Sequence, residues 1–117
     1  MASFKQGDVI KVPFPYTDRP TRQSRPALVV STGGIEDIHD LLWVVMITSA
    51  ENRGWPGDVP ITNLNMAGLP VASVIRTAKI ATIEAGDATR LGKVSPAQIR
   101  QVTKRLSQEL GFPPATA

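Results

Sequence analysis

Short apolar runs, each ended by Gly or Pro, occupy most of the chain. Apolar and polar residues alternate from Val9 to Phe14 after the Gly7-Asp8 pair, which predicts a half-buried strand. The run over 41–48 is apolar throughout, so we expect a central strand that is buried on both faces. Further strands are expected over 26–31, 71–76 and 79–84. Short strands with frequent turns predict a small antiparallel β-barrel.

The last quarter of the sequence changes to a helical period. Ser95 is a suitable N-cap with Gln98 completing a capping box, Pro96 fits the first helical position, and Gly111 provides a stop. These signals predict a helix over 96–110. We expect its apolar stripe to dock on the barrel; the stripe consists of Ile99, Val102, Leu106 and Leu110.

Length and composition fit one globular domain of 117 residues, which we place at 1–112 with a frayed tail at 113–117. The longest apolar run is far shorter than the ~20 residues of a membrane span, and the chain has no cysteine. We therefore expect a soluble, cytoplasmic protein without a membrane partner. The small core leaves room for a second copy to share in stability.

The residue types restrict the chemistry of any active site. His39 is the only histidine, and cysteines and glycine-rich phosphate loops are missing from the sequence, so we expect neither a metal site nor a cofactor. Arginine, hydroxyl and carboxylate groups remain, and they suit phosphodiester chemistry because a guanidinium binds and stabilises phosphate oxygens. Candidates at the ends of expected strands are Arg25, Thr48, Ser49 and Arg76. Structural roles for these side chains stay open on position alone.

Basic residues are clustered although the net charge is only +3. Arg19, Arg22 and Arg25 fall in one polar segment that also contains Asp18. Such a segment fits a polyanion such as nucleic acid, but charge alone favours an ordinary solvated surface.

Four segments, taken in order, resemble the MazF/PemK family of toxins from type II toxin-antitoxin modules. They are GDVIKVPFPYTDRPTRQSRPALVVS at 7–31, MITS at 46–49, AGLPVASVIRTAKIATIE at 67–84 and LGKVSPAQIRQVTKRLSQELG at 91–111. The resemblance implies an SH3-like barrel with a C-terminal helix, a homodimer and a cognate antitoxin protein. It also implies metal-independent, sequence-specific cleavage of single-stranded RNA to 2′,3′-cyclic phosphate and 5′-OH ends.

The resemblance also assigns roles to residues. Arg25 matches the family's catalytic arginine, Thr48 its phosphate-binding threonine, and Arg76 the arginine that some PemK-type members use as an acid. Ala78 stands where some of those members place the aspartate proposed as general base. We expect Asp18 to replace it, with a turn-forming role as the alternative.

RNA contacts are expected from two turn-rich loops, at 15–24 and 52–60, and from their neighbours. Arg19, Arg22 and Arg53 would hold phosphates, and Trp55 would stack on a base or else anchor its loop. Ser49 and Lys79 complete the expected RNA-binding set. Two other functions compete with the ribonuclease: a CcdB-like gyrase inhibitor, whose Trp-x-Ile ending this chain lacks, and a non-catalytic SH3-like binding module.

Overall fold

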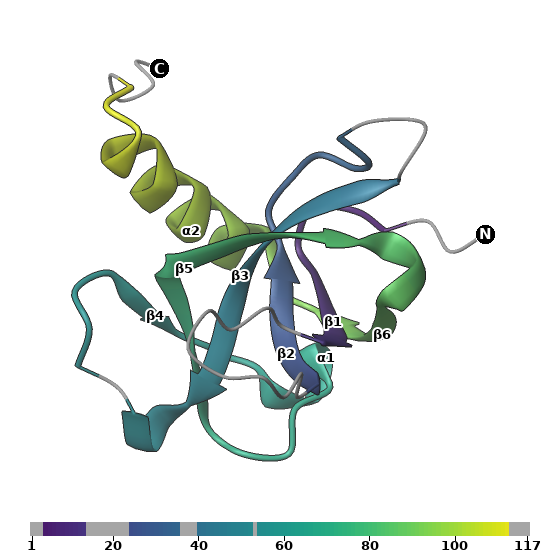
Figure 1. The fold of residues 1–117 in the computed structure, drawn as a ribbon. Helices are drawn as coiled ribbons and strands as arrows, with labels where there is room; N and C mark the ends of the chain where they lie inside the picture. The colour runs from purple at the N-terminus through teal and green to yellow at the C-terminus, as the bar shows by residue number, and fades with distance from the viewer. Residues whose placement is uncertain (1–3, 14–23, 36–39, 53, 113–117) are drawn as a thin grey trace.

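The fold is a curled antiparallel sheet with one long helix against it (Figure 1). The computed structural model describes residues 4–13, 24–35, 40–52 and 54–112. The sheet has six strands in the order β4-β5-β3-β2-β1-β6. Their bounds are β1 Asp8–Pro13, β2 Ser24–Val29, β3 Leu41–Ser49, β4 Asp58–Pro60, β5 Ser73–Glu84 and β6 Thr89–Lys93. The helices are α1 Leu64–Ala67 and α2 Pro96–Glu109, and the 3₁₀ turns are η1 Ala50–Asn52 and η2 Ala85–Asp87.

The expected mainly β fold with a C-terminal helix is confirmed. β4 and β6 lie at the two edges of the sheet, so the sheet is curled like a barrel but is not closed in the part of the chain that is described. β3 pairs with β5 on one side and β2 on the other, and most of its residues are buried. The prediction of a central strand over 41–48 is therefore confirmed.

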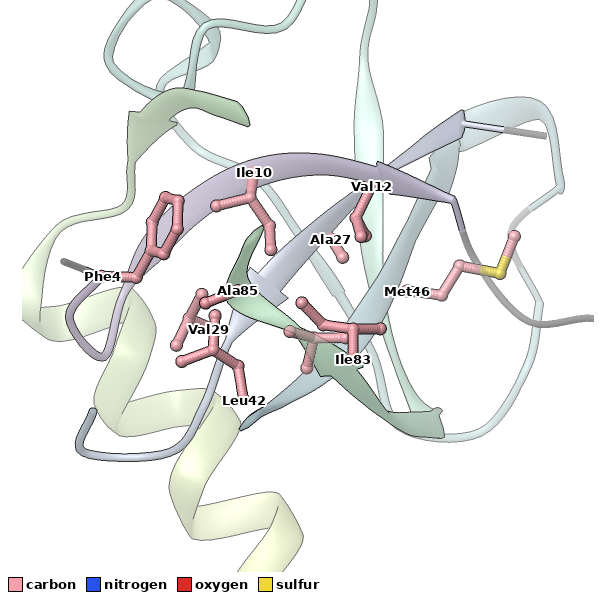
Figure 2. Packing of buried hydrophobic residues seen from close by; sticks show 10 residues of the cluster. Phe4, Ile10, Val12, Ala27, Val29, Leu42, Met46, Ile83 and Ala85 are labelled. Carbon is pink, nitrogen blue, oxygen red and sulfur yellow. The ribbon is translucent and has the colours of Figure 1, made fainter. Parts of the chain in front are cut away.

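Apolar side chains cover both faces of the sheet. The inner core lies within the curl (Figure 2) and consists of Phe4, Ile10, Val12, Ala27, Val29, Leu42, Val44, Met46, Ile83 and Ala85. The outer core lies on the opposite face and consists of Val9, Leu28, Val30, Val45, Ile47, Ala67, Leu69, Ile75, Val94 and Val102. Neighbouring residues of β2 and β3 alternate between the two cores, as the period of two in a strand requires.

β5 is one strand of 12 residues, so the prediction of two separate strands over 71–76 and 79–84 was wrong. The register nevertheless breaks between them, because Val45 pairs with Ile80 and the next residue, Met46, pairs with Arg76. Thr77, Ala78 and Lys79 therefore form a bulge. The break that the sequence indicated between 76 and 79 is this bulge, and the strand continues on both sides of it.

The predicted C-terminal helix is present as α2. The Ser95 hydroxyl accepts a hydrogen bond from the backbone N–H of Gln98, as expected. The buried Gln98 side chain does not complete the capping box, because it accepts from Thr62 N at 3.1 Å and donates to the Pro60 carbonyl at 3.1 Å. Leu110 is 70% exposed, so the expectation that it docks on the sheet was wrong. No helix within the described residues has both the length and the apolar character needed to cross a membrane.

No sequence pattern predicted α1 or β6, which pack against each other through two glycines. Gly68 ends α1 with a φ of +72°, and a Cβ on it would overlap the Leu91 backbone. A Cβ on Gly92 of β6 would in turn overlap the backbone of Met66 and Ala67. The close approach of these segments therefore requires glycine at both positions.

We predict that Gly92→Ala destabilises the protein by about 1–3 kcal/mol, because the added methyl group meets backbone atoms that have no room to move. Gly86→Ala is the matched control, because a Cβ there has no neighbour within 4 Å. Urea unfolding of both variants measures the difference. Equal unfolding midpoints for the two variants would contradict the close packing of α1 on β6.

Candidate functional site

The structure describes six of the ten side chains expected to act on RNA. They are Arg25, Thr48, Ser49, Trp55, Arg76 and Lys79. Asp18, Arg19, Arg22 and Arg53 lie outside the described residues, and their expected roles stay predictions.

Arg25, Thr48 and Arg76 share one face of the sheet. Arg76 pairs directly with Met46 of the inner core, and Thr48 lies two residues further along β3, so both side chains are on the inner face. Arg25 lies two residues before Ala27, another inner-core residue, and pairs across β1 with Val12. The expected catalytic residues of β2, β3 and β5 thus gather at one end of the inner face.

Arg76 is held by three neighbours. Its Nε lies 3.3 Å from Asp58 Oδ1 and its Nη2 lies 3.0 Å from Asp58 Oδ2. Nη2 also donates to the Asn52 carbonyl at 2.6 Å, and the guanidinium carbon lies 4.3 Å from the centroid of the Trp55 ring. Only 8% of each side chain in the Arg76–Asp58 ion pair is exposed. Such a buried, two-point contact fixes the orientation of the guanidinium plane.

Thr48 belongs to the same hydrogen-bond network. Asn52 Nδ2 donates to Thr48 Oγ1 at 3.1 Å, while the backbone carbonyl of Asn52 binds Arg76. A threonine hydroxyl that accepts this bond still has one O–H to donate. Asn52 therefore links the two expected catalytic residues, and the buried Thr48 hydroxyl can be directed at a phosphate oxygen.

Trp55 and Lys79 lie beside Arg76, whereas Ser49 does not. Trp55 is 45% exposed, and Lys79 Nζ lies 5.6 Å from the centroid of its ring. Ser49 follows Thr48 in β3, so strand alternation puts its side chain on the opposite face. Its hydroxyl accepts from Glu51 N at 3.3 Å, which is a local turn contact.

Sequence reasoning missed Asn52 and Asp58. Both lie in the segment between β3 and β5, where Asn, Gly, Pro and Asp are the usual residues of turns. Asp58 pairs with Arg76 across β4 and β5, 18 residues apart in sequence, and no local pattern reports such a pairing. The described residues contain no group of three or more His, Cys, Asp or Glu side chains that could hold a metal ion.

The fold is similar to that of solved toxin structures. MazF from Deinococcus radiodurans matches with a TM-score of 0.77 and 20% identity, over 96% of this chain and 100% of that one. An endoribonuclease in complex with its cognate antitoxin from a Mycobacterial species matches with a TM-score of 0.73 and 21% identity, over 98% of this chain and 100% of that one. Mycobacterium tuberculosis toxin MazF-mt6 matches with a TM-score of 0.66 and 21% identity, over 89% and 97%.

These identities are too low to transfer a function, and the matches establish the fold alone. No curated protein matches the sequence significantly. A family model does match it: the PemK-like, MazF-like toxin of type II toxin-antitoxin systems, over residues 5–110. That span includes the first three segments in which the resemblance was found, and the fourth up to Leu110. The chain therefore belongs to the PemK/MazF toxin family.

Proposed function

We propose that this protein is the toxin of a type II toxin-antitoxin module and that it acts as a metal-independent endoribonuclease on single-stranded RNA. One observation carries the proposal: Arg76 and Thr48 share a hydrogen-bond network on the face of the sheet that also holds Arg25. Membership of the toxin family and the similar fold of proteins described as endoribonucleases support it.

In the proposed reaction the ribose 2′-OH attacks the adjacent phosphorus. The O2′–P bond forms and the P–O5′ bond breaks, which leaves a 2′,3′-cyclic phosphate and a 5′-OH end. Arg25 and Thr48 stabilise the charge that builds on the phosphate oxygens, because a guanidinium stays protonated and a hydroxyl adds a directed hydrogen bond. Arg76 donates the proton that the leaving O5′ needs, and Asp18 takes the proton from the 2′-OH.

Contacts beyond the reacting phosphate set where the RNA lies. Arg19, Arg22, Arg53 and Lys79 hold flanking phosphates, and a base stacks on the Trp55 ring, which is 45% exposed. The cognate antitoxin inhibits by placing an acidic segment over these cationic side chains.

We predict that the purified protein cleaves single-stranded RNA in EDTA and that Arg25→Ala slows cleavage about 10²–10³-fold through loss of charge stabilisation. Gel analysis should show products with cyclic phosphate ends. Arg100→Ala is the control, because it removes the same charge from an exposed position on α2. Gyrase inhibition without RNA cleavage would indicate a CcdB-like poison, and RNA binding without cleavage would indicate a binding module.

A homodimer is the proposed assembly, with an apolar groove as the contact surface. This groove, of about 970 Å³, lies on the outer face between the β3–β5 pair and the C-terminal half of α2. Large apolar side chains line it with much of their surface exposed: Trp43 49%, Ile80 54%, Leu110 70% and Phe112 62%. A concentration of exposed apolar groups of this size is typical of an interface between subunits.

We predict that Ile80→Glu shifts the protein from dimer to monomer, because the carboxylate would be buried without a partner in the dimer. Val71→Glu is the matched control, because Val71 is 56% exposed and does not line the groove. Sedimentation velocity at micromolar concentration distinguishes the two states. A dimer that tolerates Ile80→Glu would place the subunit contact on another surface.

A further inference from the structure

The segment between β3 and β5 is built to bring a carboxylate to Arg76. Gly57 turns the chain with a φ of +88°, and Asp58 N donates to the Trp55 carbonyl at 3.1 Å. A Cβ on Gly57 would lie 2.8 Å from Thr77 Oγ1, whose hydroxyl donates to the Gly57 carbonyl at 3.0 Å. This tight turn starts β4, and the first residue of β4 pairs directly with Arg76.

Arg76 still has N–H groups that can donate hydrogen bonds after it has bound Asp58 and Asn52. The bonds to Asp58 and to the Asn52 carbonyl use Nε and Nη2. The two N–H groups of Nη1 are not used by these contacts, so Arg76 can be anchored on one side and donate from the other. The guanidinium carbon lies 4.3 Å from the centroid of the Trp55 ring, so the ring limits movement of the guanidinium toward that side.

We propose that Asp58 is a positioning residue of the ribonuclease, which acts on the reaction only through Arg76. This proposal rests on the proposed function. With both carboxylate oxygens bound to Arg76, Asp58 holds the guanidinium in one orientation, and Asn52 transmits that orientation to Thr48. Asp58 does not itself exchange a proton with the RNA.

A double-mutant cycle separates positioning from proton transfer. We compare the wild type, Asp58→Asn, Arg76→Ala and the double variant for cleavage of a short RNA in EDTA. Asp58→Asn should lower kcat about 10-fold or more with little change in KM, since the substrate still meets the other side chains. In the Arg76→Ala background the same change should have almost no further effect.

Three outcomes would overturn the proposal. A further large fall in kcat on adding Asp58→Asn to Arg76→Ala would show that Asp58 acts independently, as a proton acceptor does. Unchanged kcat in Asp58→Asn would show that Arg76 needs no anchor. Glu51→Gln is the matched control, because Glu51 is an exposed carboxylate in the same segment, and a similar loss of kcat in it would show a general charge effect.

Two further measurements keep the test decisive if Asp58→Asn folds poorly or if the wild type does not cleave RNA. Asp58→Glu retains a carboxylate and should keep kcat closer to the wild type than Asp58→Asn does. The ¹H–¹⁵N resonance of Arg76 Nε should be visible and slow to exchange in the wild type and in Glu51→Gln. Its loss in Asp58→Asn supports anchoring; its persistence overturns anchoring whether or not RNA is cleaved.

Discussion

The pairing of β3 with β5 determines which side chains lie on each face of the sheet, and the candidate site depends on it. β3 has Val44 and Met46 in the inner core and Val45 and Ile47 in the outer core, so this strand separates the two cores. Because β5 follows β3 over most of its length, a shift in the register of this pair by an odd number of residues moves side chains from one face to the other.

The bulge in β5 makes such a change. It inserts three residues, an odd number, so the faces of β5 exchange where the bulge occurs. Ile83 belongs to the inner core after the bulge, whereas Ile75 belongs to the outer core before it. If the register that pairs Val45 with Ile80 continued without the bulge, the Arg76 side chain would lie on the outer face. The bulge turns it to the inner face, where Thr48 and Arg25 lie.

The sequence placed Arg25, Thr48 and Arg76 on their strands but did not predict their contacts. Arg25, Thr48 and Arg76 lie in motifs that can be recognised along the chain. The run over 41–48 is apolar throughout, and 96–110 has a clear helical period. Asp58 meets Arg76 only because a three-residue strand, β4, pairs at the edge of the sheet. β4, β6 and α1 are too short to carry a detectable period, so their positions depend on tertiary packing.

The Arg76–Asp58 pair is better explained by function than by stability. The free energy needed to remove two charges from water can exceed the free energy gained from their attraction. Replacing a buried ion pair by apolar residues therefore often leaves stability unchanged or raises it by about 1–4 kcal/mol. The surrounding inner core is apolar and has a buried methionine, Met46, directly opposite Arg76. An apolar pair at 58 and 76 would therefore fit the sheet. A guanidinium held in one orientation beside the Thr48 hydroxyl is what an apolar pair cannot provide, and the phosphodiester cleavage proposed above is a reaction that needs it.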